Sequence, residues 1–395
     1  MGFARNSLGT SSFTLKAQRS SPTRSLRRNL RYPPLTKRQP LRGTGRGSRF
    51  SRGLESGSGS IFVRTFLRHA TNLLLGGVGI VLAALVVLRL LHVERRGLEQ
   101  AMIAYASPWL LLLVGTLCLA IIVKRRKLPV FAVIMSVLAG VCLLAWIQTG
   151  VRFRRPAVLP PGSESIRLVF WNADHYGAGF FEPVVRLAEL DADLLVLAES
   201  NASHGPQKAA FEQHFPKHEY LFAGMDFTMA LGPGYSVKKK RFDWFRQPGR
   251  RYDRKNWANA VIVDLETPAG GLLRVIGFDQ ASDLQSDRVL HLGQLARLLE
   301  KESEDGVPIV LVGDFNVPAD TVALDVLRRA GWERAFEASG RGLGETWPTP
   351  LPFLALDQCW TREGITVLSL RHADMDWKGA HQALILDFGI DLPAP

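Results

Sequence analysis

Residues 309–316, with the sequence IVLVGDFN, constrain the fold of this chain more than any other stretch. An apolar run of strand type ends at Gly313 and is followed by a carboxylate and a carboxamide two residues apart. Because side chains alternate between the two faces of an extended chain, we expect Asp314 and Asn316 on one face and Phe315 on the other. Such a pair at a strand end can hold a water molecule or a phosphate oxygen beside a hard cation.

Apolar runs of strand length alternate with helical stretches in the second half of the chain. We expect strands at 166–171, 193–198, near 219–230, and at 257–265, 272–278, 309–314, 355–360 and 383–388. We expect helices at about 180–190, 206–214, 286–302 and 321–330. Apolar strands that end in polar residues, with helices between them, indicate an α/β sandwich with an active site at the rim of its sheets.

Six polar residues lie at or near the ends of these apolar runs: Asn172, Glu199, Asp314, Asn316, Asp357 and His381. If the strand ends converge, these residues form a pocket of carboxylates and amides with one imidazole. Such oxygen ligands suit Mg²⁺ or Mn²⁺, and the imidazole suits the charge that develops in phosphate-ester chemistry. The sequence has neither the Cys/His spacing of a structural zinc site nor the Gly-x-Ser-x-Gly elbow of many acyl-transfer enzymes, which disfavours both classes.

The same residues occur in five short motifs, in a fixed order along the chain. These motifs are Phe170-Trp171-Asn172, Asp193-Leu-Leu-Val-Leu-Ala-Glu199, Gly313-Asp314-Phe315-Asn316, Thr346-Trp347-Pro348 with Leu356-Asp357, and Ala380-His381. Over about residues 165–390 they resemble the endonuclease/exonuclease/phosphatase superfamily, which includes deoxyribonuclease-I-like nucleases, inositol-phosphate phosphatases and sphingomyelinases. The resemblance implies a four-layered α/β sandwich of two packed mixed sheets flanked by helices. Taken singly, each residue is equally typical of a turn, a helix cap or a surface position, so the order of the whole set carries the interpretation.

The resemblance also implies a role for each residue. Glu199 would be the main ligand of a Mg²⁺ or Mn²⁺ ion, with Asn172 close to the metal and the phosphate. The catalytic residues would be Asp314, which orients or deprotonates the attacking water; Asn316, which holds a phosphate oxygen; His381, which binds or protonates the phosphoryl group; and Asp357, which orients the His381 ring and raises its pKa. A histidine–carboxylate pair of this kind stabilises an imidazolium beside the transition state.

Two positions depart from the family pattern. Ala380 stands where the family has an aspartate directly before the last histidine, which removes a carboxylate from the metal or water shell. Asp279 stands where the family has a histidine, and it replaces a cationic phosphate contact by an anion unless Asp279 itself takes a metal role. Both changes favour the alternative of a catalytically impaired binding domain on the same scaffold.

Three apolar segments, at about 70–92, 103–123 and 128–148, precede the domain. Each approaches or exceeds the roughly 20 residues that a helix needs to cross the hydrocarbon core. We expect three transmembrane helices, the alternative being buried helices of a soluble protein. The basic loop 124–127 and the basic N-terminus would lie on the cytoplasmic side, as the positive-inside rule predicts. The chain after residue 156 would then face the extracytoplasmic side of a bacterial inner membrane.

The overall charge of +13 is concentrated in the N-terminal part. Residues 1–60 hold 13 Lys and Arg residues against one acid, Glu55, and few large apolar side chains, so we expect them to be disordered. This tail can be interpreted as an RNA-binding arm, a contact with anionic lipid headgroups, or a solvated anchor.

Residues 157–395 are acidic, with 33 Asp and Glu against 24 Lys and Arg. This balance argues against a protein that coats nucleic acid through its bulk charge. A basic cluster nevertheless stands at 238–241 and 250–255, interleaved with aromatic residues. It could contact phosphate groups of nucleic acid or lipid headgroups, or it could be a solvated loop.

The chain is therefore expected to contain four parts: a disordered basic tail (1–60), a membrane region (61–155), a linker (156–164) and an endonuclease/exonuclease/phosphatase-like domain (165–390). We predict a membrane-anchored hydrolase of phosphate esters that depends on Mg²⁺ or Mn²⁺. It would be a phosphodiesterase acting on nucleic acid, a phospholipid headgroup or a soluble ester by in-line attack of water. Its expected partners are this substrate and the lipid bilayer, and no protein partner is predicted.

Overall fold

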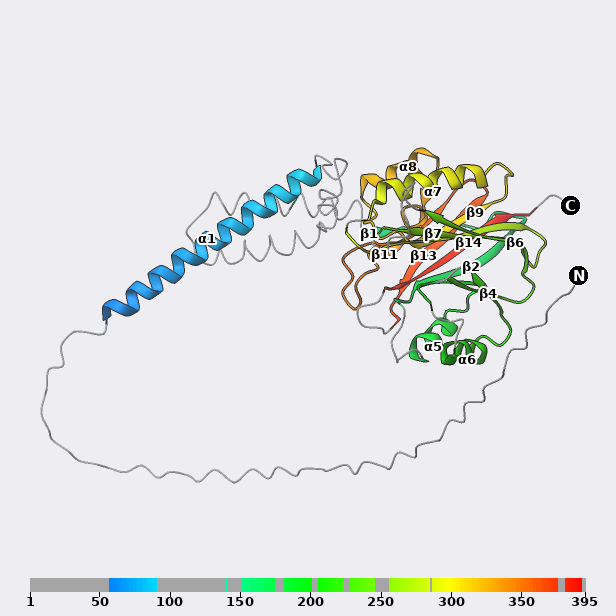
Figure 1. The fold of residues 1–395 in the computed structure, drawn as a ribbon, viewed down its shortest axis with the longest axis horizontal. Coiled ribbons are helices and arrows are strands. Elements are labelled where there is room, and N and C mark those ends of the chain that lie inside the picture. Colours follow the sequence, from blue (N-terminus) through cyan, green and yellow to red (C-terminus); the bar gives the residue numbers. More distant parts are fainter. Residues whose placement is uncertain are drawn as a thin grey trace, which may run out of the picture. The chain divides into compact units, whose positions relative to one another are not determined.

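The computed structural model describes residues 57–90, 140, 151–174, 181–200, 205–223, 227–245, 256–284, 286–375 and 381–392 (Figure 1). The predicted tail therefore lies outside the described residues, apart from 57–60. Helix α1 spans Gly57–Leu90 and contains most of the first predicted membrane segment. The other two predicted segments lie outside the described residues except for Gly140. Within the described part of the chain, no helix is both long and apolar enough to cross a membrane, and the three membrane helices stay a prediction.

Two six-stranded sheets form the domain. The first contains β2 (Ser163–Asn172), β3 (Leu194–Ala198), β4 (Glu219–Ala223), β5 (Phe227–Leu231), β13 (Ile365–Ala373) and β14 (Ala383–Asp391). The second contains β6 (Ser236–Phe245), β7 (Ala258–Glu266), β8 (Leu272–Gln280), β9 (Ile309–Asp314), β10 (Glu333–Arg334) and β12 (Asp357–Thr361). Their strand orders are β13-β14-β2-β3-β5-β4 and β10-β12-β9-β8-β7-β6. Each sheet has one parallel pair, β2–β3 or β8–β9, so both sheets are mixed.

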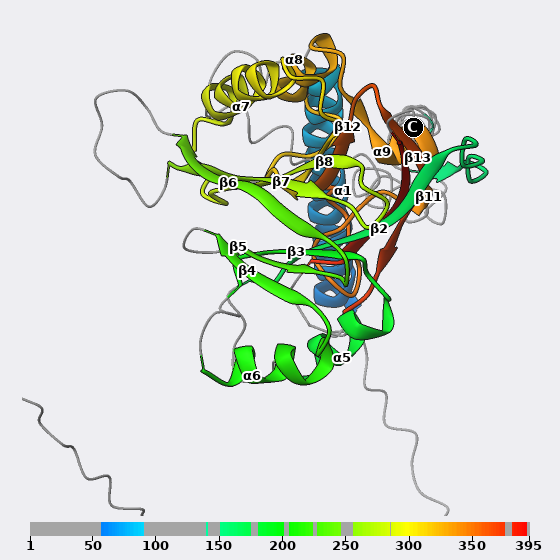
Figure 2. The same cartoon turned by 90° about the vertical axis from the view of Figure 1, so that its right-hand side faces the viewer.

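The two sheets pack face to face, and helices cover their outer faces (Figure 2). The helices of the domain are α5 (Phe181–Glu189), α6 (Gly205–His214), α7 (Arg288–Glu302), α8 (Asp325–Arg329) and α9 (Ala335–Ser339). Leu187 of α5 and Phe211 of α6 pack under the first sheet, and Leu295 of α7 packs over the second. Between the sheets, Phe170 of β2 shares a buried core with Val312 of β9. The expected sandwich of two packed mixed sheets with flanking helices is confirmed.

The basic run 238–241 lies on β6, an edge strand of the second sheet, and not in a loop. The sequence reading missed β6 because much of the strand is exposed and carries charged side chains in place of an apolar run. The second basic run, 250–255, lies outside the described residues. The loop interpretation is therefore wrong for the first run and stays open for the second.

Several other elements of the secondary structure also differ from the prediction. Most of the missed strand β13 is partly exposed, with only Val367 and Leu370 buried, and the predicted strand near 219–230 is a hairpin of β4 and β5. The predicted helix 321–330 is a 3₁₀ turn, Val322–Leu324, followed by α8. Strand β1 (Val151–Phe153) pairs with β11 (Arg341–Leu343), so contacts with the domain begin ahead of the predicted linker.

His291 of α7 should make stability depend on pH. Its ring is fully buried, and neither ring nitrogen has a hydrogen-bond partner in the described part of the chain. Burial lowers the pKa of His291 to about 4, although the charge of Asp287 opposes the change. As the pH falls below about 6.5, the imidazole becomes protonated in the unfolded state but stays neutral in the folded state, because its pKa is lower there. The native state therefore loses stability relative to the unfolded state.

We expect this histidine to remove about 2 kcal/mol of unfolding free energy between pH 7 and pH 5. Urea unfolding of wild type and His291→Leu at the two pH values measures the effect as the difference between their losses. His214→Leu, at the end of α6, is the matched control and should follow the wild type. Equal pH dependence in wild type and His291→Leu would show that His291 titrates normally in the fold.

Candidate active site

Three carboxylates form a row across the second sheet at one end of the sandwich. Asp314 pairs with Asp279 in the parallel β8–β9 ladder and with Asp357 in the antiparallel β9–β12 ladder. Paired residues share a face, and Val312, two residues before Asp314, lies in the core between the sheets. All three carboxylates therefore point into the space between the sheets. The sequence placed Asp357 at the end of an apolar run, but it begins β12 and reaches the row because β12 runs antiparallel to β9.

The chain turns sharply after Asp314. Asn316 adopts a left-handed backbone with φ of 45°, and its N–H donates to Asp314 Oδ1 over 2.8 Å. Its Nδ2 donates to Asp314 Oδ2 over 3.0 Å and to the carbonyl oxygen of Gln280 over 2.7 Å. The backbone is thus not extended at Asn316, but the turn returns its side chain to Asp314, and Phe315 packs on the opposite face as predicted. A Cβ at Gly313 would lie 1.9 Å from a carbonyl oxygen of β8, so only glycine allows this close approach of the strands.

The first sheet contributes Asn172, at the end of β2, and Glu199, directly after β3. Asn172 Nδ2 donates to Asp314 Oδ2 over 2.8 Å and reaches Glu199 Oε1 over 3.4 Å. This amide therefore joins the two sheets at the site. Glu199, with φ of 48°, is a second non-glycine residue in the left-handed region. Backbone strain of this kind clusters at functional sites, which favours a role for both turns beyond connecting strands.

His381 stands just before β14, and its ring faces the carboxylate row. Its Nδ1 lies 2.7 Å from Asp357 Oδ2, and its Nε2 lies 3.9 Å from Asp314 Oδ2. Trp171 Nε1 donates to the carbonyl oxygen of His381 over 3.0 Å. Thr346 Oγ1 accepts hydrogen bonds from the backbone N–H groups of Asp357 and Leu356. These contacts fix both members of the histidine–carboxylate pair, and they give Trp171 and Thr346 positioning roles that the sequence did not assign.

The charges of the site shift two pKa values. Burial alone would lower the pKa of His381, but the neighbouring charges of Asp357 and Asp314 raise it to about 9. The imidazole is therefore protonated at neutral pH. Burial raises the pKa of Asp314, while the positive charge of His381 opposes that change. His381 can thus act as a proton donor and Asp314 as a proton acceptor within one buried cluster.

Asp357→Asn should lower the pKa of His381 by at least about one pH unit, because the amide keeps the shape but removes the closest negative charge. Titration of the histidine ring signals by NMR in the metal-free protein measures it, with His381→Gln to assign the resonance. Asp391→Asn, at the far end of β14, is the matched control. An unchanged pKa in Asp357→Asn would mean that Asp357 does not hold the proton on His381.

Two overlapping groups of side chains could hold a metal ion. Asp314, Asp357 and His381 form one, and Glu199, Asp279 and Asp314 form the other; within each group the ligand atoms lie within 4.8 Å of one another. The second group consists of carboxylate oxygens from β8, β9 and the turn after β3, and it has no sulfur or nitrogen donor. Such a donor set fits a hard cation such as Mg²⁺ or Mn²⁺.

The structure brings together all six residues that the sequence singled out. Hydrogen bonds join Asn172, Asp314 and Asn316, while Glu199 and the His381–Asp357 pair border them. Asp279, which the sequence noted as a departure, lies in the same row. Ala380 lies outside the described residues. The roles of the six residues in binding and catalysis stay predictions.

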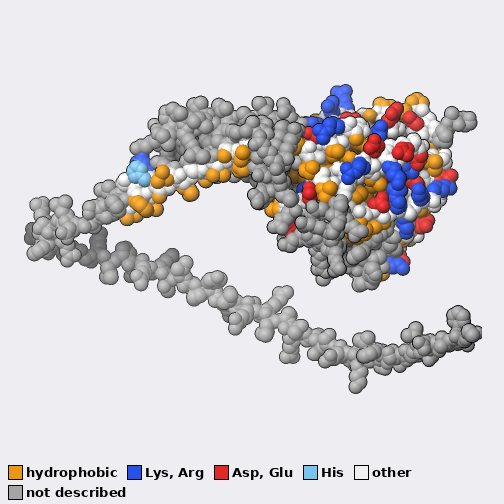
Figure 3. All heavy atoms as spheres, turned by 45° about the horizontal axis from the view of Figure 1, so that its top comes forward, with side chains coloured by type: hydrophobic (Ala, Val, Ile, Leu, Met, Phe, Trp, Pro, Cys, Tyr) orange, Lys and Arg blue, Asp and Glu red, His pale blue; other side chains and the backbone are white. Residues whose placement is uncertain are grey.

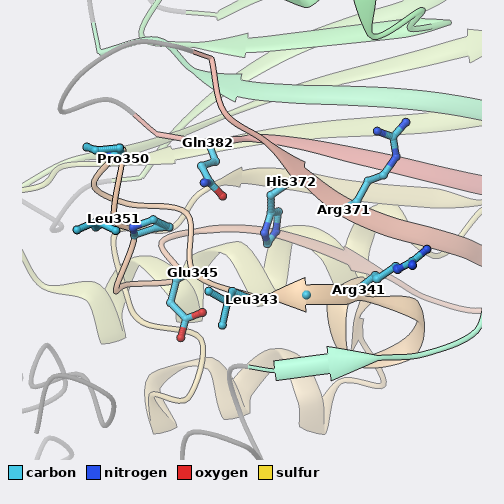
Figure 4. A pocket seen from close by; sticks show the side chains of 10 residues that line it. Arg341, Leu343, Glu345, Pro350, Leu351, Arg371, His372 and Gln382 are labelled. Carbon is cyan, nitrogen blue, oxygen red and sulfur yellow. The ribbon is translucent and has the colours of Figure 1, made fainter. Parts of the chain in front are cut away.

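A separate pocket of about 580 Å³ is lined by residues of β11, of β13 and of the segment 345–352 (Figure 4). Its lining includes Gln382 and Glu345, the sequence neighbours of His381 and Thr346. Arg341 and Arg371 add positive charge, and prolines and leucines add apolar surface. None of the six predicted residues lines this pocket, so it is distinct from the carboxylate row.

Residues 171–372, just over half of the chain, match the sequence profile of the Endonuclease/Exonuclease/phosphatase family. One similar solved structure is an endonuclease/exonuclease/phosphatase from Bacteroides vulgatus, with 13% identity and a TM-score of 0.49 over 57% of this chain and 99% of that chain. Another is a mannosyl-6-phosphatase from Bacteroides thetaiotaomicron, with 12% identity and a TM-score of 0.47 over 56% and 99% of the two chains. The catalytic domain of human Nocturnin, with bound sulfate, has 13% identity and a TM-score of 0.47 over 59% and 100%. These likenesses are distant, and nothing about activity follows from them. No curated protein matches the sequence.

Proposed function

Because this chain belongs to the endonuclease/exonuclease/phosphatase family, we propose that it is a metal-dependent hydrolase of phosphate esters. The observation that carries the proposal is the junction of the two sheets. There, Asn172 Nδ2 donates to Asp314 Oδ2 over 2.8 Å, and His381 Nε2 lies 3.9 Å from the same oxygen. A buried carboxylate, a protonated imidazole and a set of metal-compatible oxygens in one place suit the hydrolysis of a phosphate ester.

In the proposed reaction, water attacks phosphorus in line with the leaving oxygen. Asp314 orients this water and accepts its proton, while the two asparagine amides hold the carboxylate still. His381, kept protonated by Asp357, donates a hydrogen bond or a proton to the phosphoryl group or to the leaving oxygen. A divalent cation at Glu199 would supply charge neutralisation at the phosphate oxygens.

We propose further that the substrate is a phosphodiester and that the domain acts on the extracytoplasmic side of a bacterial inner membrane. The apolar segments at 70–92, 103–123 and 128–148 and the basic loop 124–127 support an anchor in this orientation. The described surface mixes basic and acidic side chains (Figure 3), which favours local recognition of a phosphate over binding through bulk charge.

The proposed orientation can be tested with alkaline phosphatase, which is active only outside the cytoplasm, fused to the C-terminus. We expect the fusion to be active in cells; an inactive fusion with normal expression would contradict the orientation.

The first test of the function is hydrolysis by the full-length protein in detergent with Mg²⁺ or Mn²⁺. The probes are bis-p-nitrophenyl phosphate, p-nitrophenyl phosphate and plasmid DNA. We expect turnover that EDTA abolishes and added metal restores, with the diester cleaved faster than the monoester. His381→Ala should lower kcat by about 10² to 10³, whereas His214→Ala should leave it unchanged. A folded protein without turnover on any probe would contradict the proposal.

A catalytically impaired binding domain is the second candidate, and the buried carboxylate of Asp279 favours it because an anion repels a phosphate. Such a domain would bind a phosphodiester in the presence of metal without releasing product. Binding of a hydrolysis-resistant phosphorothioate, measured beside turnover, separates the two candidates: tight binding without turnover of the parent diester would favour the binding domain.

A further inference from the structure

The row of side chains across the second sheet continues past the residues that the proposed function uses. The register places Asp279 opposite Asn259 of β7, and Asn259 opposite Trp244 of β6. Because paired residues share a face, Asn259 points to the same side of the sheet as Asp279 and Asp314. Val261, two residues further along β7, lies in the core between the sheets, which identifies that side.

Asn259 is a polar side chain in a place that requires a partner. Only 1% of the residue is exposed, and its Oδ1 has no hydrogen-bond partner in the part of the chain that the structure describes. Buried polar atoms are nearly always satisfied by a donor, a water or an ion. The residue beside Asn259 in the ladder is Asp279, so a cation near the Asp279 carboxylate can also take Asn259 Oδ1 as a ligand.

The charge of the site also leaves room for a further cation. Glu199, Asp279 and Asp314 each offer an oxygen within 4.8 Å of the others, and Asp314 belongs as well to the group with Asp357 and His381. Carboxylates this close repel one another strongly in buried surroundings. One divalent cation balances two of the three charges at Glu199, Asp279 and Asp314, and an incoming phosphate ester adds more negative charge.

We propose that Asp279 and Asn259 hold a second divalent cation, beside the cation at Glu199. The proposal rests on the proposed function for the first cation and adds a two-metal arrangement, in which both ions contact the oxygens of one phosphate ester. Carboxylate and amide oxygens suit a hard cation of the Mg²⁺ or Mn²⁺ class.

Binding of Mn²⁺ to the full-length protein without substrate tests the proposal, with free Mn²⁺ measured by electron paramagnetic resonance. We expect two Mn²⁺ per wild-type chain and one for either Asp279→Asn or Glu199→Gln. Asn259→Leu should weaken the second ion by about tenfold or more. Glu300→Gln, on the exposed side of α7, is the matched control and should keep two. Because oxygens of Glu199 and Asp279 lie within 4.8 Å of each other, the two bound ions should be close enough to show a coupled spectrum, which Asp279→Asn should abolish.

Thermal unfolding in metal-free buffer checks that each variant folds, and Asp279→Ala is the second variant if Asp279→Asn does not fold. Fewer than two Mn²⁺ on the wild type would overturn the proposal, whatever the variants bind. Two Mn²⁺ on both the wild type and Asp279→Asn would overturn the assignment of Asp279. Two bound Mn²⁺ without hydrolysis of any probe would instead contradict the proposed function and leave the second cation site standing.

Discussion

Asp314→Asn is expected to lower kcat for bis-p-nitrophenyl phosphate by about 10³ to 10⁴, with little change in KM. The Asp314 carboxylate is buried and accepts hydrogen bonds from the backbone and side chain of Asn316 and from Asn172. These donors hold the carboxylate in one orientation, so its remaining lone pair can accept a hydrogen bond from the proposed water. An amide of the same shape cannot take up the proton of that water, and its NH₂ group would meet donors where acceptors are needed. Steady-state kinetics at saturating Mg²⁺ measures the loss.

Asp191→Asn is the matched control for this change. Asp191 is exposed and also has a left-handed backbone, with φ of 51°, but it lies outside the site. The control should keep the wild-type kcat, and circular dichroism should show that both variants fold. If Asp314→Asn keeps more than about a tenth of the wild-type kcat, Asp314 is not the proposed base.

Glu199→Gln should lower kcat/KM by about 10³ at limiting Mg²⁺ and raise the Mg²⁺ concentration that gives half of the maximal rate. The left-handed turn after β3 aims Glu199 at Asn172 Nδ2, and a Glu199 oxygen lies within 4.8 Å of oxygens of Asp279 and Asp314. Glutamine keeps the size of the side chain and an oxygen for Asn172, so the variant removes only the charge that attracts the cation. The rate measured as a function of Mg²⁺ concentration reports the change.

Glu300→Gln makes the same chemical change on the exposed side of α7 and should leave the Mg²⁺ dependence untouched. Glu199→Asp keeps the charge but shortens the side chain by one methylene, and its rate should fall between those of wild type and Glu199→Gln. A wild-type Mg²⁺ dependence in Glu199→Gln would remove Glu199 from the proposed metal site.

The accuracy of the sequence-based fold follows the burial of each strand. Strands β2, β3 and β9 have apolar side chains on both faces, so they form continuous runs that were predicted within a few residues. Strands β6 and β13 are mostly exposed or partly exposed, so they form no continuous apolar run, and the sequence-based prediction missed both. The six candidate site residues were predictable because each stands where an apolar run meets a polar turn, a boundary visible in the local sequence. The membrane segments were predicted by length and apolarity alone and still await a test.

The sequence by itself determined the residue types that end the strands, the order of the motifs and the alternation of strands and helices. Only the tertiary structure decided which of these residues meet. It placed Asp357 opposite Asp314, turned Asn316 back onto Asp314, and put Asn259 beside Asp279. Strand register of this kind is set by packing two sheets against a shared core, which joins segments far apart in the chain. Because the packing energy that sets the register comes from contacts between distant segments, periodicity and spacing can indicate a carboxylate site. They cannot specify which side chains lie close enough to bind the same ion.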